Sequence, residues 1–342
     1  MTTTKNPRHN VKRPTLTDVA EHAGVSYQTV SRVINHHPSV ATKTRTRVLK
    51  AVAELGYRPN QAAQSLVTRR SKTVGIISSG TKYSGPAQMV TNIEAALKAR
   101  GYGLAVATLE EPTLEQMHSA VDQLNRQSVD GFILITPIQK NSSTEISQLL
   151  DSPFIMVDIK LGEQIPSVII DQRYGAKIAT QHLLDLGHRD VCEISGPLTW
   201  SDAEQRHQGW LLALREAGID SCVSVESDWT AAGGYAATRQ LLEKTSFTAL
   251  FVGNDQMALG AMRAFWEHGL RVPDDVSILG FDDVPEAAFY TPPLTTVRQD
   301  FTTLGRQSVE YLMALIQAPH TPTHQRVLYP ELIVRHSTSQ FE

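Results

Sequence analysis

Polar side chains between residues 26 and 35 are suited to reading DNA. Gln28 can bond to the N6 and N7 edge of adenine, Arg32 can donate two parallel hydrogen bonds to guanine, and Tyr27 can pack on a thymine methyl group. Phosphates, which set register without reading sequence, are the better partners for Thr29, Ser31 and Asn35. An ordinary solvated helix face is the alternative interpretation.

A second set of residues, in the longer C-terminal part of the chain, is suited to holding a sugar. Polar side chains directly follow predicted strands, where open α/β sheets bind ligands, at Asp158, Asn254, Asp255, Asp282 and Asp283. Such groups can hold adjacent hydroxyls, Arg206 can donate from its rigid fork, and Trp229 offers a flat face to the C–H side of a ring. Helix capping for the acidic residues and core packing for the tryptophan remain open as alternatives.

Three predicted helices position the DNA-reading set. Thr15 and Asp18 form a start resembling a capping box, and Gly24 ends that first helix. Ser26, which belongs to the candidate DNA-binding set, is placed to cap a second helix, so the two helices make a helix-turn-helix. A third amphipathic run, over residues 43–55, is expected to close the core with Val48, Leu49, Val52 and Leu55.

The charge distribution supports a nucleic-acid-binding arm. Residues 1–72 hold thirteen Lys and Arg against three Asp and Glu, whereas the remainder holds nineteen against thirty-two. A basic segment joined to an acidic body is typical of proteins that bind nucleic acid.

The rest of the chain is predicted to be a doubly wound α/β body. Eight short apolar runs alternate with helical ones, namely TVGIIS, GLAVAT, GFILIT, FIMVD, SVIID, VCEIS, ALFVG and VSILGF. Strands that are apolar on both faces indicate parallel sheets covered by helices on both sides. About 260 residues exceed one such sheet, so we expect two lobes with a ligand cleft between them.

Several other classes of protein are disfavoured. No apolar run approaches the length of a membrane helix, and no apolar segment of a secretory signal follows the basic start, so a cytoplasmic protein is expected. Cys192 and Cys222 lack metal-site spacing, and neither a metal nor another cofactor is expected. The phosphate-binding, zinc-protease and nucleophile-elbow motifs are missing, which argues against an enzyme.

The stretch TLTDVAEHAGVSYQTVSRVIN resembles the headpiece of the lac repressor family. The resemblance implies that Tyr27, Gln28 and Arg32 read bases. It continues through PNQAAQSL, which is similar to the hinge helix of the family and implies DNA contacts by Asn60, Ala63, Gln64 and Leu66. Leu66 matches a leucine that the family inserts into the minor groove to kink DNA.

The body also resembles this family, in the segments GPLTWSDAEQRHQGW, SDWTAAGG, GNDQMALGAMRA, LGFDD and PPLTTVRQDF. The resemblance implies a two-lobed body similar to periplasmic sugar-binding proteins. The sugar contacts that it implies are Ser79, Asp158, Arg206, Trp229, Asn254, Asp282, Gln299 and Phe301. Glu111 and Ile170 depart from the expected arginine and aromatic residue, so the sugar that binds here can differ.

The expected organisation has five parts: a flexible basic N-terminus (1–13), a headpiece (14–59), a hinge helix and linker (60–72), a two-lobed body (73–335) and a short tail (336–342). The tail lacks a leucine heptad for tetramer formation, so we expect a homodimer on a pseudo-palindromic operator. The resemblance implies a repressor released from DNA by a β-galactoside or a related neutral sugar. The alternative is a relative in which a purine or a protein corepressor strengthens DNA binding.

Overall fold

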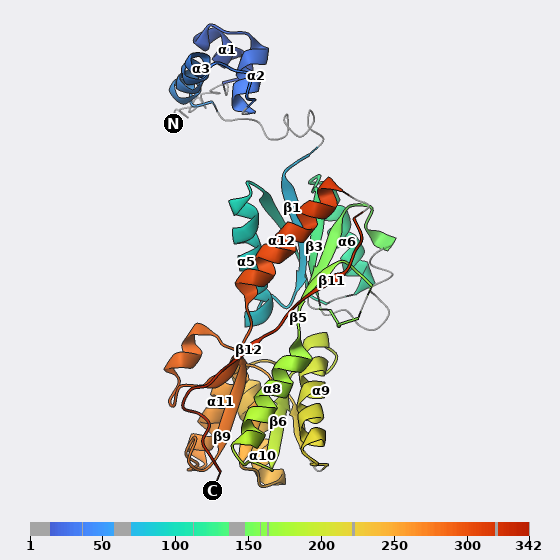
Figure 1. Ribbon diagram of the computed structural model, residues 1–342, viewed down its shortest axis with the longest axis vertical. Helices are drawn as coiled ribbons and strands as arrows, with labels where there is room; N and C mark the ends of the chain where they lie inside the picture. Colours follow the sequence, from blue (N-terminus) through green and yellow to red (C-terminus); the bar gives the residue numbers. More distant parts are fainter. Residues whose placement is uncertain are drawn as a thin grey trace, which may run out of the picture. The chain divides into compact units, whose positions relative to one another are not determined.

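The computed structural model divides into two compact units, Met1–Ser71 and Lys72–Glu342, which we call the headpiece and the body (Figure 1). It describes residues 14–35, 37–57, 70–111, 113–136, 148–157, 159–162, 164–220, 223–318 and 321–341. Five predicted site residues lie outside these ranges: Asn60, Ala63, Gln64 and Leu66 of the hinge, and Asp158 of the sugar set.

The described part of the headpiece contains the predicted helix-turn-helix. It consists of α1 (Leu16–Ala23) and α2 (Tyr27–Ile34), followed by α3 (Thr42–Leu55). A capping box begins α1, because Thr15 Oγ1 accepts from the Asp18 amide at 3.3 Å and the Asp18 carboxylate accepts from the Thr15 amide at 2.7 Å. Gly24 ends α1 with a φ of 58°, in the left-handed region that glycine enters without strain.

Each helix of the headpiece contributes a fully buried valine to one small core: Val19, Val30 and Val48. The prediction that Leu49 joins this core is wrong, since its side chain is 50% exposed. Ala51 is buried instead, three residues after Val48 and therefore on the same face of α3. Leu49 follows Val48 directly and is rotated by about 100° away from that face.

The first lobe of the body, the N-lobe, is built on six parallel strands in the order β11-β5-β4-β3-β1-β2. The strands are β1 (Thr73–Ser79), β2 (Gly103–Leu109), β3 (Gly131–Ile135), β4 (Phe154–Val157), β5 (Ser167–Ile170) and β11 (Gln325–Leu328). Helices α5 (Ser84–Ala99) and α12 (Phe301–Gln317) pack on one face, and α6 (Leu114–Asn125) packs on the other. Both faces of the four inner strands, β1, β3, β4 and β5, are therefore buried.

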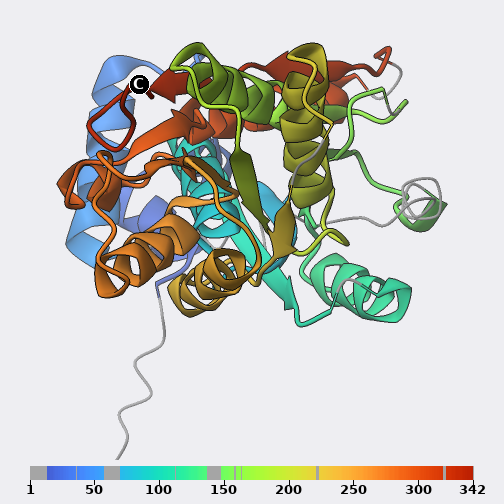
Figure 2. The same cartoon turned by 90° about the horizontal axis from the view of Figure 1, so that it is seen from below.

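The second lobe, the C-lobe, has the strand order β12-β10-β9-β8-β6-β7, with only β12 antiparallel to its neighbour. Its strands are β6 (Val191–Ser195), β7 (Ser224–Glu226), β8 (Ala249–Val252), β9 (Ser277–Asp282), β10 (Thr295–Arg298) and β12 (Glu331–Ile333). Figure 2 shows α8 (Gln172–Asp185) and α9 (Ser201–Glu216) together on one side of this sheet, and α10 (Ala231–Lys244) and α11 (Asp255–Glu267) on the other. A 3₁₀ helix, η1 (Pro285–Phe289), follows β9.

The predicted doubly wound fold is confirmed, and all eight apolar runs form strands. Strands β7, β10, β11 and β12, which have three or four residues each, were not predicted. The chain passes between the lobes after β5, after β10 and after β11. Within the described ranges, no helix has both the length and the apolar character needed to cross a membrane.

Candidate functional site

The first candidate site is the exposed face of α2 in the headpiece. Tyr27 is 54% exposed, and Gln28 and Arg32 are also exposed. Ser26 caps the helix, because its hydroxyl accepts from the Thr29 amide at 3.3 Å. The three side chains predicted to read bases therefore lie at the solvent face of a helix whose opposite face holds the headpiece core.

The second candidate site lies where the carboxyl ends of strands from both lobes meet. We call it the inner pocket. The N-lobe contributes residues 83–86 and Met89, at the start of α5. The C-lobe side is lined by Gln172, Trp200, Asp202, Arg206, Trp229, Asn254, Asp282 and Gln299. Most of these residues lie at helix N-termini that directly follow strands, which is where ligands bind in doubly wound sheets.

Arg206 of α9 is the central cation of the inner pocket. It is buried, its Nε donates to Gln172 Oε1 at 2.9 Å, and its guanidinium donates to the Gly253 carbonyl at 2.5 Å. Carboxylate oxygens of Asp282 and Asp202 lie 3.4 and 3.8 Å from its nitrogens. The guanidinium also stacks 3.9 Å above the ring of Phe281. The arginine is thus fixed in position, with its charge compensated within the protein.

Asp282 is held at the pocket by a chain of amides. Gln299 Nε2 donates to its carboxylate at 2.7 Å, and Gln172 Nε2 donates to Gln299 Oε1 at 2.8 Å. Burial raises the pKa of Asp282 to about 6, although Arg206 and Gln299 favour the ionised form. The backbone φ of 107° is a strained value for a residue with a side chain, as is found at functional sites.

Trp229 forms the apolar wall of the pocket. Its ring lies so close to Gly196 that a Cβ added there would be 2.2 Å from it, so only glycine fits. Asn254 Nδ2 donates to the Trp229 carbonyl at 3.1 Å, and Asn254 Oδ1 caps α11 by accepting from the Met257 amide at 2.8 Å. Capping and lining the pocket are therefore compatible roles for Asn254.

Comparison with known proteins shows the family. Residues 15–60 match the bacterial regulatory proteins of the lacI family, and residues 180–338 match a periplasmic binding protein-like domain. The lactose operon repressor of Escherichia coli K12 is 38% identical over 331 residues, which are 96% of this chain and 91% of that protein. The chain belongs to the lacI family of bacterial regulatory proteins.

Other similar proteins include a second repressor and solved structures that hold different ligands. The transcriptional repressor PurR of Pasteurella multocida is 33% identical over 94% of this chain and 98% of its own. Among solved structures, the lac repressor dimer bound to operator and the anti-inducer ONPF has a TM-score of 0.89 at 38% identity, covering 96% of this chain and all of that one. A complex of the regulator CelR with cellobiose has a TM-score of 0.71 at 34% identity, covering 95% of this chain and all of that one. As predicted, this lacI-family protein is a transcriptional repressor and not an enzyme.

In this lacI-family protein, five predicted sugar contacts line the inner pocket together: Arg206, Trp229, Asn254, Asp282 and Gln299. Ser79 is buried at the end of β1, and Phe301 lies in the N-lobe core at the start of α12. Neither is among the residues that line the inner pocket. The departures Glu111 and Ile170 are not among them either.

Asp255 and Asp283, the other acidic residues after strands, have structural partners. Asp255 accepts from Thr296 Oγ1 at 2.6 Å and from the Val284 amide at 2.8 Å. Burial, reinforced by the nearby charge of Asp282, raises its pKa well above the usual range. Asp283 is paired with Arg298 and Arg335. Neither lines the inner pocket.

The sequence-based prediction missed eight residues of the inner pocket: residues 83–86 and Met89 of the N-lobe, and Gln172, Trp200 and Asp202 of the C-lobe. Ring pairs link Tyr83 to Trp200, with centroids 5.6 Å apart, and Trp200 to Trp229, with centroids 6.3 Å apart. These rings connect the N-lobe to the C-lobe. The i,i+4 spacing of Asp202 and Arg206 could have identified one of the eight, because it places both on one face of α9.

Proposed function

We propose that this repressor binds an operator of two symmetric half-sites as a homodimer, and that a small neutral sugar in the inner pocket releases it. Dimer and operator are supported by the similarity to the lac repressor dimer bound to operator. The sugar is supported chiefly by one observation: Arg206 is buried between two carboxylates beside the ring of Trp229.

The charge balance favours a neutral, polyhydroxylated effector. A phosphate or carboxylate effector needs a cation with charge to spare, whereas Arg206 already faces Asp202 and Asp282. Carboxylate and amide oxygens accept from hydroxyl groups, and a tryptophan ring packs on the C–H face of a pyranose. We assign these roles to Asp282, Asn254 and Gln299, with Trp229 as the apolar wall.

In the headpiece, we assign base reading to Tyr27, Gln28 and Arg32 and phosphate contacts to Ser26, Thr29, Ser31 and Asn35. The exposure of Tyr27, Gln28 and Arg32 supports the first assignment. The second fits the short polar side chains around the N-terminus and exposed side of α2, since helix N-termini favour phosphate. The hinge contacts stay a prediction from the resemblance alone.

The proposed switch depends on the volume of the inner pocket. This pocket has a volume of about 20 Å³, enough for little more than one water molecule. A sugar must therefore widen it, and two contacts resist the widening: the Tyr83–Trp200 ring pair and the Lys160–Glu204 ion pair, each joining the two lobes. A ligand that binds only the widened arrangement shifts the population of the body toward that arrangement. Release of the repressor from DNA by a ligand requires such a shift.

The test is operator binding by fluorescence anisotropy at fixed salt, with and without a panel of neutral sugars. We expect one sugar to weaken operator binding, and operator DNA to weaken binding of that sugar by the same factor. The alternative function is a repressor in which a purine strengthens DNA binding, and the similarity to PurR supports it. Guanine and hypoxanthine test this alternative. A purine that strengthens operator binding, with every sugar inert, would replace the proposed effector.

A further inference from the structure

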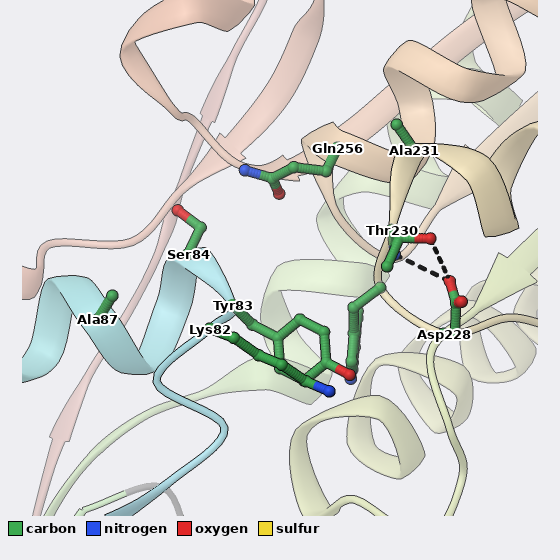
Figure 3. Close-up of a pocket in the computed structure, with 9 residues that line it drawn as sticks. Lys82, Tyr83, Ser84, Ala87, Asp228, Thr230, Ala231 and Gln256 are labelled. Carbon is green, nitrogen blue, oxygen red and sulfur yellow. Dashed lines mark hydrogen bonds between the residues drawn. The ribbon is translucent and has the colours of Figure 1, made fainter.

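A buried ion pair under α9 lies outside the inner pocket. Glu193 of β6 pairs with His207 of α9, and neither residue lines the inner pocket or the larger cavity that adjoins it. That larger cavity has a volume of about 620 Å³, and Figure 3 shows Tyr83 and Ser84 lining it from the N-lobe. The ion pair is therefore a part of the body that the proposed sugar contacts do not explain.

The pair joins α9 to two strands of the C-lobe sheet. Glu193 is the middle residue of β6 and is fully buried. Nδ1 of His207 lies 2.5 Å from Glu193 Oε2. Ser224, which faces Glu193 across the β6–β7 ladder, donates its hydroxyl to the same oxygen at 2.6 Å. One carboxylate oxygen therefore holds α9, β6 and β7 together.

The charge of Glu193 depends on His207 for its compensation. A buried carboxylate is strongly disfavoured unless a cation and hydrogen bonds compensate it. Among the described residues, His207 is the only basic side chain paired with Glu193, and Glu193 Oε1 makes no hydrogen bond with them. The proton on His207 therefore decides whether this buried carboxylate is balanced by a positive charge.

His207 can change its charge near neutral pH. The hydrogen bond with Glu193 raises the pKa of His207, and partial burial opposes this shift without cancelling it. The side chain of His207 is 23% exposed, so protons reach it from solvent. Other charged side chains on the surrounding elements are exposed or have partners of their own: Glu226 of β7 and Arg173 of α8 are exposed, Lys177 of α8 pairs with Glu216, and Glu204 of α9 pairs with Lys160.

Helix α9 connects this ion pair to the inner pocket. His207 directly follows Arg206, and Asp202 lies about one and a half turns earlier on the same helix. Both Arg206 and Asp202 line the inner pocket. Trp200, at the N-cap of α9, packs on Tyr83 of the N-lobe. Because a helix moves as a rigid element, a shift of α9 on β6 displaces these pocket residues together.

We propose that His207 is a positioning residue for the effector pocket, and that its ion pair with Glu193 makes effector binding sensitive to pH. This inference rests on the proposed function and adds a form of regulation to it. Protonated His207 holds α9 on β6, with Arg206 and Asp202 in place. When His207 loses its proton, the buried carboxylate is no longer balanced, α9 is held less firmly, and the effector binds more weakly.

The effect lies on the alkaline side of neutral pH. The ion pair is complete below about pH 6.5, the ordinary pKa of histidine, and is lost as the pH rises through the raised pKa of His207. Asp282, with a pKa of about 6, changes its charge on the acidic side of this range. Variants of His207 keep the titration of Asp282, so they separate the two effects.

The test is the pH profile of sugar binding by the full chain, measured by calorimetry between pH 6.5 and pH 9. Lactose is the first probe, followed by cellobiose and glucose if lactose does not bind. His207→Gln keeps a hydrogen-bond donor without a titrating charge, and His207→Lys keeps a cation at every pH of the series. His118→Gln is the matched control, since His118 is exposed on α6 and lines neither cavity.

We expect the affinity of the wild-type chain to fall at least about fivefold over this range, which is the lower end of typical couplings between sites. His207→Gln should bind weakly and His207→Lys tightly at every pH, and the control should keep the wild-type profile. A flat wild-type profile, or one that both His207 variants reproduce, would overturn the inference and leave the proposed function intact. His207→Lys decides the outcome if His207→Gln does not fold.

Hydrogen exchange of α9 tests the inference without any sugar. After correction for the intrinsic effect of pH on exchange, the amides of α9 should lose protection relative to those of α10 between pH 6.5 and pH 9. His207→Lys should keep that protection, and equal protection of the wild-type helix at both pH values would overturn the inference. Failure of every sugar, together with a response to a purine, would overturn the proposed function, and the exchange of α9 would then decide the inference alone.

Discussion

Replacing Asp282 by asparagine should stabilise the protein at neutral pH. Asp282 binds its proton more tightly in the folded chain, where its pKa is about 6, than in the unfolded chain, where it is about 3.8. The free energy of unfolding therefore falls as the pH rises from about 4 to about 6, and the whole penalty is present above that range. Asparagine keeps an acceptor for Gln299 and removes the charge that burial disfavours.

The difference between the pKa of Asp282 in the folded chain and in the unfolded chain corresponds to about 3 kcal/mol in the free energy of unfolding. An opposing effect is the loss of a carboxylate 3.4 Å from Arg206, because removing one partner of a buried ion pair usually destabilises a protein. Arg206 keeps Asp202 at 3.8 Å and its hydrogen bonds to Gln172 and Gly253. Because the raised pKa already includes the attraction to Arg206, we expect desolvation to outweigh it.

The assay is urea unfolding of the wild-type chain and of Asp282→Asn at a series of pH values from 4 to 8, with Asp220→Asn as an exposed control. The variant should be more stable by about 3 kcal/mol at pH 7.5, and the difference should shrink toward zero near pH 4. A less stable variant at pH 7.5 would show that the ion pair outweighs desolvation, and a difference independent of pH would refute the reasoning. The same variant should bind the sugar more weakly, since a carboxylate accepts more strongly than an amide.

Three further predictions concern other parts of the molecule. Arg32→Ala should weaken operator binding by about 1 to 3 kcal/mol and relax the sequence preference at one base pair. Anisotropy on a set of single-base operator variants would reveal this loss of preference. A uniform loss of affinity for all variants would instead indicate a phosphate contact. Gly196→Ala should displace the ring of Trp229 and abolish sugar binding in calorimetry, whereas Gly103→Ala, where a Cβ meets only ordinary contacts, should retain it. Thr15→Ala should destabilise α1 by about 1 kcal/mol, because it removes the capping side chain. The amides of α1 should then exchange hydrogen faster relative to those of α3. Unchanged exchange would exclude a role for the capping box.

The sequence was most informative where local chemistry decides the structure. The capping box of Thr15 and the left-handed Gly24 predicted α1 and its end, because both act within a few residues of the backbone. The apolar runs predicted their strands for a similar reason, since both faces of every one of these strands except the edge strand β2 are buried. Leu49 was assigned wrongly because its apolar character alone does not say which side of α3 faces the core.

Short elements carried too little pattern to be recognised. Strands β7 and β12 have three residues each. This length is too short to show the alternation of apolar and polar residues that identifies a strand. They form because neighbouring strands offer them backbone partners, as β10 does for β12. Their pairing depends on a sheet assembled from distant parts of the chain.

For the candidate site, composition and resemblance identified most of the polar groups. The sequence placed Asn254, Asp255 and Asp282 after strands, in the same way for all three. The structure separates them: Asp255 turns toward Thr296 and the Val284 amide, whereas Asn254 and Asp282 line the inner pocket. The direction of a side chain at a strand end depends on the neighbouring strand, which no local pattern contains.

By itself, the sequence determined the basic helix-turn-helix headpiece, the two-lobed α/β body and the residue types suited to DNA and to a sugar. These follow from periodicity, capping and charge, which act over short distances along the chain. Only the tertiary structure decided which groups share a pocket: it brought Tyr83 of one lobe against Trp200 of the other, and Gln172 onto Gln299. Contacts of this kind join residues more than a hundred positions apart, so they depend on how the two sheets pack and where the chain crosses between them.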